Sequence, residues 1–404
     1  MRTQNWSLLA AMLLWLLPCL AAAQNTSAEK QYGPGVSDTE ILLGQTMPYS
    51  GPVSSLAIEG IVEKAYFDMI NERGGVRGRK IRLISLDDAY SPPKTVEQTR
   101  RLVEQDNVLA IFSSMGTPTN SAIQAYLNSK KVPQLFAASG ASRFFDPAKS
   151  PWSIGGQMAL RSEGAAYAKY IRNHLPNARI AVLYQNDDFG RDMLGGLKDE
   201  LGEASAKMIV AETPYNASDV TVDSQILALK ATGADVLLYF ATPKFAAQAI
   251  RKAYELDWRP TRFLAVASAH VKSVLEPAGY EASKGLITVG DIQRLDDPNV
   301  DQEMRDYYAF MKKWVPNGHP EQNVEAQGYL LANLLVQILE RCGDNLTREN
   351  LMKVTTSMKD VTVPLKLHGL KINTSPTDYR LIRMVEVRQF DGQKWVATGE
   401  RSDM

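Results

Sequence analysis

The stretch from Phe112 to Asn120, FSSMGTPTN, places small polar residues and a glycine between an apolar run and a helical pattern. Such a junction leaves backbone N–H groups at the start of the helix free to bind an anion. Three interpretations are open from these residues: a phosphate cradle in an enzyme, a seat for another anion, or a tight turn. A phosphate site would also need a lysine, a metal ligand or a glycine-rich repeat, and none surrounds this stretch.

The other residues that could support catalysis do not form a recognisable catalytic or metal-binding pattern. Serines such as Ser113 lack the Gly-x-Ser-x-Gly context of a hydrolase. The letters of Asp188-Phe189-Gly190 match the kinase magnesium motif, but no phosphate loop or catalytic loop accompanies them. The histidines are scattered without metal-ligand spacing: His174, His270, His319 and His368. We therefore predict that the chain is not an enzyme and holds no cofactor or metal.

A few charged residues could still contact a ligand. Asp87-Asp88 and Asp187-Asp188 end two apolar runs, where capping of the following helix is a simpler role than paired-carboxylate catalysis. Arg143 and Arg161 could hold an anion, although solvated surface arginines are the simpler interpretation. His270 adjoins a polar turn and could hydrogen-bond an acid.

Length and charge limit the classes of function. A chain of 404 residues exceeds one ordinary core and favours two or three domains. Its 45 basic and 45 acidic residues give no electrostatic reason to expect nucleic acid or an anionic membrane as partner.

The N-terminus has the pattern of an export signal. Arg2 precedes an apolar run from Leu8 to Leu17, and Ala21-x-Ala23 is a suitable cleavage signal. We predict a signal peptide over residues 1–23 and export to the periplasm; a signal anchor or a lipoprotein at Cys19 are the alternatives. After cleavage only Cys342 remains, so we expect no intramolecular disulfide.

Apolar runs alternate with helical patterns along most of the chain, which predicts parallel sheets covered by helices on both faces. A loop-rich passage, FFDPAKSPWSIGG, divides two such series, and each predicts a doubly wound lobe. In the first long helix one apolar stripe is expected to face the core: Ile58, Ile61, Val62, Ala65, Tyr66, Met69 and Ile70. Later helices are predicted at about 94–104, 121–129, 191–201 and 220–232.

The last hundred residues are expected to return to both lobes. Two helical stretches, about 300–314 and 324–341, could complete the first lobe, and a strand–turn–strand tail around Asp391-Gly392 could join the second. We therefore predict a first lobe of residues 36–155 and 289–363, and a second lobe of residues 156–288 and 364–404.

The order of several segments resembles the periplasmic Leu/Ile/Val-type substrate-binding proteins of ABC importers, the type I periplasmic binding proteins. The matching pieces include the Ser-Gly-Pro turn, INERGGVRGR, DDAYSPPKTV, VPQLFAASGAS, RIAVLYQNDDFG and AQGYLLANLL. The resemblance implies two α/β lobes joined by a three-strand hinge, with a small ligand in the cleft between them. It also implies a membrane permease as partner, and we expect a monomer.

Ligand contacts are carried over from this resemblance by position. In the first lobe they are Leu56 together with Ser50, Gly116, Thr117, Ala138, Ser139 and Gly140, and the loops of these last six hold the ligand's carboxylate in amino-acid binders. In the second lobe they are Phe189, Thr242, and Ala267 or Ser268. The family's first-lobe disulfide would join the positions of Tyr90 and the Gly116 region, neither of which is cysteine.

Four positions depart from the amino-acid pattern. The turn VASAH stands where leucine-type proteins have an acidic residue, Phe189 and Thr242 stand for tyrosines, and Leu56 stands for an aromatic residue. An α-ammonium needs a carboxylate partner, since an unpaired buried charge is costly. We therefore predict a small hydrophobic or aromatic carboxylate without an ammonium as the ligand. The alternatives are a branched-chain amino acid, a ligand sensor of the same fold and a secreted α/β enzyme.

Overall fold

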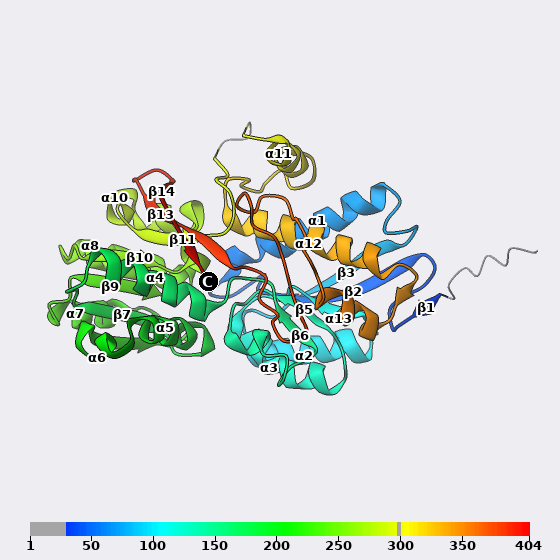
Figure 1. Cartoon of the computed structure of the whole chain (residues 1–404), viewed down its shortest axis with the longest axis horizontal. Helices are drawn as coiled ribbons and strands as arrows, with labels where there is room; N and C mark the ends of the chain where they lie inside the picture. The colour runs from blue at the N-terminus through cyan, green and yellow to red at the C-terminus, as the bar shows by residue number, and fades with distance from the viewer. Residues whose placement is uncertain (1–29, 297–299) are drawn as a thin grey trace, which may run out of the picture.

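The computed structural model describes residues 30–296 and 300–404. They form two lobes that lie side by side, each built around one sheet (Figure 1). The predicted signal peptide, its cleavage point near Ala23 and Cys19 lie outside the described residues. Within the described ranges, no helix is long and apolar enough to span a bilayer.

The first lobe contains a five-stranded parallel sheet in the order β3-β2-β4-β5-β6. Its strands are β2 (Glu40–Met47), β3 (Lys80–Asp87), β4 (Ala110–Phe112), β5 (Gln134–Ala137) and β6 (Ser153–Gly155). The helices between them are α1 (Ile58–Glu72), α2 (Pro92–Glu104) and α3 (Thr117–Ser129). Strand β3 lies on one side of β2, and β4 lies on its other side. The polar loops that follow β2 and β4 therefore meet at the carboxyl edge of the sheet, between these two strands.

The second lobe repeats this order with β8-β7-β9-β10-β11, all parallel, and adds an antiparallel pair. Its parallel strands are β7 (Ile180–Gln185), β8 (Ile209–Tyr215), β9 (Val236–Phe240), β10 (Thr261–Leu264) and β11 (Ile287–Gly290). The added strands are β13 (Met384–Phe390) and β14 (Trp395–Asp403). Its main helices are α4 (Leu160–His174), α5 (Asp188–Leu201), α7 (Asp223–Ala231) and α8 (Pro243–Glu255).

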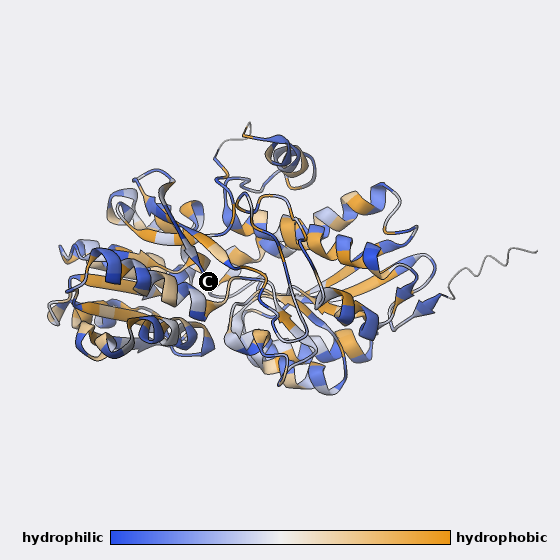
Figure 2. Cartoon of the chain, viewed as in Figure 1, coloured by the Kyte–Doolittle hydropathy of each residue, from blue (hydrophilic) through white to orange (hydrophobic). Residues whose placement is uncertain are grey.

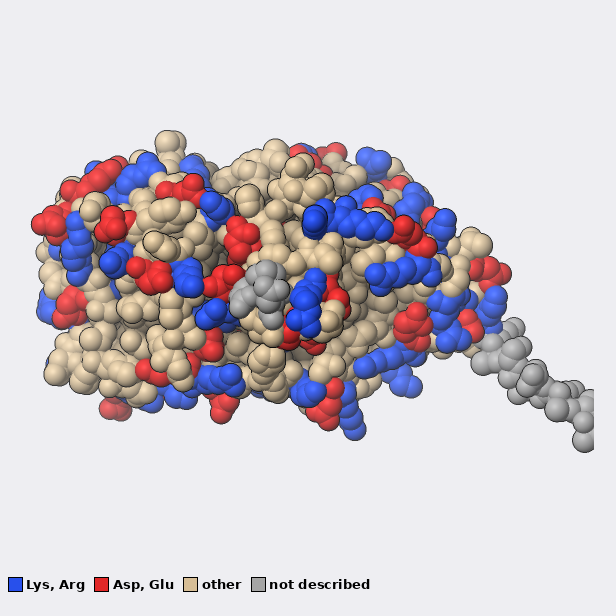
Figure 3. All heavy atoms as spheres, turned by 90° about the horizontal axis from the view of Figure 1, so that it is seen from above, with Lys and Arg blue, Asp and Glu red and all other residues tan. Residues whose placement is uncertain are grey.

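The apolar runs of the sequence form these strands and the helix faces against them (Figure 2). In β9 all five side chains are buried, as expected for a strand covered on both faces. On the face seen in Figure 3, basic and acidic side chains of the described residues are interspersed over both lobes.

The C-terminal region returns to both sheets. Helices α11 (Gln302–Trp314) and α12 (Asn323–Cys342) lie against α1, and α13 (Arg348–Thr355) follows. A short strand pair, β1 (Gln31–Tyr32) with β12 (Asn345–Leu346), joins the start of the described chain to this region. The two predicted doubly wound lobes are therefore confirmed, while the exact division of residues between lobes stays a prediction.

Three chain segments connect the lobes, after β6, after β11 and before β13. The second and third segments pair with each other, because Ile292 and Lys366 form an isolated antiparallel bridge. Gln293 N–H donates to the Leu365 carbonyl at 2.7 Å, and Leu367 N–H donates to the Asp291 carbonyl at 2.9 Å.

The predicted apolar stripe of α1 is wrong at one position. Ile61 is 47% exposed, whereas Glu59 and Glu63 are buried at 1% and 0%. The face of α1 toward the sheet meets polar partners, since Gln45 donates to Glu63 and Ser113 donates to Glu59. The apolar periodicity of a helix predicts only which apolar residues face the core, so it cannot predict a buried polar contact.

Two predicted helix starts are too late, and that of α7 is too early, because this helix begins at Asp223 rather than Val220. Helix α3 begins at Thr117 rather than Ser121, and α5 begins at Asp188 rather than Arg191. In α5 the Asp187 carboxylate caps the helix by accepting from Phe189 N–H at 2.9 Å. In α3 a proline occupies the first turn, where its missing N–H costs nothing.

Candidate functional site

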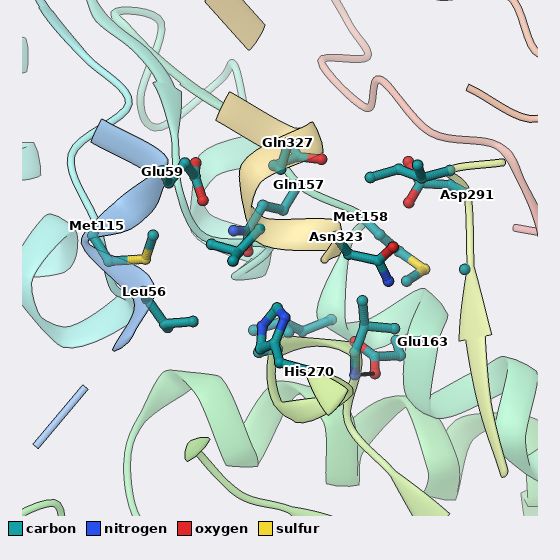
Figure 4. Close-up of a pocket in the computed structure, with 16 residues that line it drawn as sticks. Leu56, Glu59, Met115, Gln157, Met158, Glu163, His270, Asp291, Asn323 and Gln327 are labelled. Carbon is teal, nitrogen blue, oxygen red and sulfur yellow. Dashed lines mark hydrogen bonds between the residues drawn. The ribbon is translucent and has the colours of Figure 1, made fainter. Parts of the chain in front are cut away.

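A cavity of about 80 Å³ lies between the two lobes. Its walls come from α1, from the start of α12, and from the segments that follow β4, β6, β10 and β11 (Figure 4). These segments stand at the carboxyl ends of parallel strands, which is where open α/β sheets bind ligands. One water molecule needs only roughly 10–15 Å³ of such space, so the cavity can hold a larger group.

Apolar side chains from both lobes form one part of the wall. Leu56, Met115 and Val324 face the cavity from the first lobe, and Val266 faces it from the second. Met158 and Leu160 come from the segment that connects β6 to α4. A hydrocarbon group would lose water and gain close contacts here.

Glu59 brings a carboxyl group to the cavity from α1. The residue is 1% exposed, and the Ser113 hydroxyl donates to it at 3.3 Å. Burial raises the pKa of Glu59 to about 8, although the Ser113 hydrogen bond and the charge of Lys366 act in the other direction. Glu59 is therefore mainly protonated at neutral pH and can donate a hydrogen bond.

Glu163 brings a second carboxyl group from α4. Its Oε1 accepts from Val266 N–H at 2.8 Å and from the Tyr167 hydroxyl at 2.9 Å. Burial raises the pKa of Glu163 to about 7, against these two hydrogen bonds. A third carboxyl group, that of Asp291, forms an ion pair with Lys366 at the crossing between the lobes.

Neutral polar groups complete the wall. His270 is 5% exposed, and its Nδ1 has no hydrogen-bond partner among the described residues. Burial lowers the pKa of His270 to about 4, so the ring is neutral at physiological pH. Gln157 and Asn323 also face the cavity, as does Gln327, whose amide donates to the Gly156 carbonyl at 3.1 Å. No lysine or arginine is among the described residues that line it.

Two of the predicted contacts, Leu56 and Ala267, line this cavity, and His270 does so as well. The other predicted contacts lie in neighbouring structure. Thr117 and Ser139 bond to each other through their hydroxyls at 2.7 Å, and Gly116 N–H donates to the Ala138 carbonyl at 3.1 Å.

Ser50 is exposed beyond the carboxyl end of β2, where its hydroxyl donates to Asp87 at the end of β3 at 2.8 Å, and it does not line the cavity. Gly140 lies behind the cavity wall, because a Cβ at this position would stand 1.8 Å from the carbonyl oxygen of Met158. Leu160 N–H also donates to the Gly140 carbonyl at 2.8 Å. Gly140 therefore shapes the segment that carries Met158 and Leu160 into the wall.

The remaining second-lobe contacts are buried within their own lobe. Thr242 donates to Gln185 at 3.0 Å and lies 3.2 Å from the Tyr215 hydroxyl. Ser268 donates to the Ala241 carbonyl at 2.6 Å, and Phe189 is 6% exposed. That these residues contact a ligand stays a prediction.

The two arginines considered above pair with acids. Arg143 pairs with Asp188 of the other lobe at 3.1 Å, and Arg161 pairs with Asp199. Neither lines the cavity. Cys342 is buried and unpaired, and burial raises the pKa of its thiol to about 12. Its role is therefore structural.

Sequence reasoning missed most of the polar wall, above all Glu59, Glu163, Asp291 and Asn323. A signal was present for Gln327, which stands inside AQGYLLANLL, one of the segments that carry the resemblance. The carboxyl groups gave no such signal, because their approach depends on how α1, α4 and the crossing segments pack.

Comparison with known proteins gives matches that span most of the chain. A family model described as "Periplasmic binding protein" matches residues 40–394. A curated relative, "Leu/Ile/Val-binding protein homolog 7" of Brucella abortus (strain 2308), is 23% identical over 325 residues, which cover 78% of this chain and 80% of the relative.

Solved structures share the fold. A branched-chain amino acid ABC transporter protein from Thermus thermophilus with bound valine aligns with a TM-score of 0.80 at 16% identity, covering 91% of this chain and 98% of that one. A fatty acid ABC transporter substrate-binding protein from Thermomonospora curvata aligns with a TM-score of 0.79 at 21% identity, covering 93% and 95%. At these identities the likeness shows the fold alone.

Proposed function

Because the chain belongs to the family of periplasmic binding proteins, which are not enzymes, we propose that it is the periplasmic solute-binding component of an ABC importer. We propose further that its ligand is a small, largely apolar carboxylic acid held in the interlobe cavity. In this role the protein acts as a monomer, closes on the ligand by hinge motion and presents the closed form to a membrane permease.

One observation carries the choice of ligand. The cavity combines an apolar wall, represented by Leu56, Met115 and Val266, with hydrogen-bonding groups that are neutral at physiological pH. Protonated Glu59 and the amides of Gln157 and Asn323 can donate to a carboxylate. The apolar wall then covers the hydrocarbon part of the acid.

A branched-chain or other aliphatic amino acid is the second candidate. The turn VASAH lacks an acidic residue, but Glu163 reaches this turn from α4 and accepts a hydrogen bond from Val266 N–H. Glu59 and Asp291 line the same cavity. An ammonium beside these groups would favour their ionised forms, so an amino acid could find a charge partner here, which removes part of the reason for excluding it.

Leucine and 4-methylpentanoate form a matched pair for the test, because they differ only in the ammonium group. We expect isothermal titration calorimetry to show that 4-methylpentanoate binds and that its affinity falls between pH 7 and 9 as Glu59 loses its proton. Phenylacetate tests whether an aromatic acid fits. Tight binding of leucine without binding of 4-methylpentanoate would overturn the acid and support the amino acid.

The transport role needs a separate measurement. Deletion of the gene should abolish uptake of radiolabelled 4-methylpentanoate by intact cells, and expression of the intact chain should restore it. Unchanged uptake in the deletion strain would argue for the alternative, in which the closed form signals to a membrane receptor.

A further inference from the structure

Tyr90 lies beside the cavity without lining it, and its backbone is unusual. It lies in the loop between β3 and α2, with φ of 58°, next to Ala89 with φ of 54°. A left-handed backbone is rare for a bulky residue and persists where surrounding contacts hold it. One such contact is the bond from Tyr90 N–H to the Asp88 carboxylate at 2.9 Å.

The ring of Tyr90 lies directly on Gly116. A Cβ at Gly116, where φ is 101°, would stand 2.4 Å from Cε2 of the ring, so any side chain at this position would collide with Tyr90. The residue is 8% exposed. It therefore covers the first-lobe stretch that carries Gly116 and Thr117, where small polar residues predicted an anion seat.

Tyr90 also reaches the other lobe. Its hydroxyl lies 3.5 Å from the Gln185 amide, and Gln185 in turn accepts from the Tyr215 hydroxyl at 3.1 Å and from the Thr242 hydroxyl at 3.0 Å. The ring thus bridges from Gly116 in the first lobe to Gln185 at the end of β7 in the second.

Tyr90 packs in the apolar cluster that forms part of the cavity wall. Leu56, Met115 and Val324 line the cavity and belong to the same apolar cluster as Tyr90. Loss of the ring would therefore leave space next to side chains that already bound the cavity. Leucine and methionine side chains can change rotamer to join such neighbouring spaces.

We propose that Tyr90 determines ligand length: its ring fills the space between Gly116 and Gln185 beside the cavity and limits the site to short ligands. The inference rests on the proposed function, since it assigns a size limit to the same site. Removal of the ring would extend the cavity toward the hydroxyls of Thr117 and Ser139.

A pair of variants separates this role from a structural one. Wild-type protein, Tyr90→Ala and Tyr90→Phe are titrated with 4-methylpentanoate and with octanoate. We expect wild type to prefer the shorter acid, and Tyr90→Ala to shift the ratio of affinities toward octanoate by at least about tenfold. Tyr90→Phe keeps the ring and should keep the wild-type ratio.

Two results of this titration would overturn the proposal. One is an equal loss of affinity for both acids in Tyr90→Ala, which would mean that the ring only supports the fold. The other is wild-type binding of octanoate as tight as that of 4-methylpentanoate.

A second arm does not depend on the ligand class. Tyr90→Gly suits the left-handed backbone and removes the whole side chain, so 4-methylphenol, which has the shape of that side chain, should bind in its place. We expect 4-methylphenol to raise the Tm of Tyr90→Gly and to leave that of wild type unchanged. No rise would overturn the proposal, whereas failure of wild type to bind any acid, with a rise here, would overturn only the proposed ligand.

Discussion

Two buried carboxyl groups, those of Glu59 and Glu63, stand one helical turn apart on α1. Both are raised in pKa, Glu59 chiefly by burial and Glu63 by burial together with the charge of Glu59. The charge of Lys366, in the C-terminal crossing segment, lowers the pKa of Glu59 but does not cancel the effect of burial. Glu63 Oε1 has no hydrogen-bond partner among the described residues. The pair therefore favours the protonated form.

The sign of the pH dependence follows from the raised pKa. The carboxyl group of Glu59 titrates near its usual 4.5 in the unfolded chain and near 8 in the folded protein. Between these values the folded state binds the extra proton, so this group stabilises the fold at low pH and loses that effect as pH rises toward 8.

Glu59→Gln should therefore remove part of the pH dependence of stability. The free energy of unfolding of the variant minus that of wild type should increase with pH, by up to about 1.4 kcal/mol per pH unit between pH 5 and 8. The reason is that glutamine has no proton to lose. Urea denaturation at several pH values measures it. The exposed Glu97→Gln on α2 is the control, and parallel curves for Glu59→Gln and wild type would contradict the prediction.

Some residues of the site could be predicted from the sequence, and others are seen only in the structure. Leu56 and Ala267 line the cavity as predicted. They could be predicted because the family resemblance fixes the fold, and the fold fixes where the segments that follow the strands lie. Glu59 and Glu163 sit within helices, where a charged residue usually predicts a solvated face. Only the packing of α1 and α4 against the cleft shows that these two face inward, and one sequence does not record that packing.

At the scale of elements, the N-terminal end of α5 makes several contacts with the first lobe. The Asp192 carboxylate accepts from Ser142 N–H at 2.6 Å, and Asp188 pairs with Arg143 at 3.1 Å. The hydroxyl of Ser121 on α3 also donates to Asp188 at 3.3 Å. The Arg143–Asp188 pair is nearly half exposed on both sides and contributes little.

Asp192→Ala should therefore favour an open arrangement of the lobes. Loss of the bond to Ser142 N–H costs the closed form about 1 kcal/mol, which is roughly a fivefold shift in the balance of open and closed forms. Small-angle scattering of the ligand-free variant should show a larger radius of gyration than that of wild type. Asp199→Ala removes an acid from the same helix, one whose partner Arg161 lies on α4, and should leave the radius unchanged. An equal increase in both variants would refute the role of Asp192.

The elements themselves were largely predictable. Alternating strands and helices, with apolar runs such as β9, are enough to give parallel sheets. The helix starts at Thr117 and Asp188 were misplaced because capping residues and a first-turn proline carry no apolar periodicity. Ile61 was misplaced because the buried face of α1 also contains Glu59 and Glu63, whose polar contacts leave no signal in the apolar pattern.

At the scale of the whole molecule, the lobes depend on the crossing segments to hold their relative position. Asp291 in the second crossing pairs with Lys366 in the third, with side chains 10% and 3% exposed. The antiparallel bridge between Ile292 and Lys366 aligns the same two segments. Because the pair also borders the cavity through Asp291, it links the hinge to the site.

Lys366→Met should destabilise the protein by more than the loss of side-chain packing alone can explain. The variant leaves the Asp291 carboxylate buried without its partner, close to Glu163, whose pKa the charge of Asp291 already raises. We expect the free energy of unfolding to fall by about 3 kcal/mol. The double variant Asp291→Asn/Lys366→Met removes both charges and should recover most of this loss. If the double variant is as unstable as Lys366→Met alone, the unpaired charge is not the cause, and the aliphatic part of Lys366 holds the crossing segments together instead.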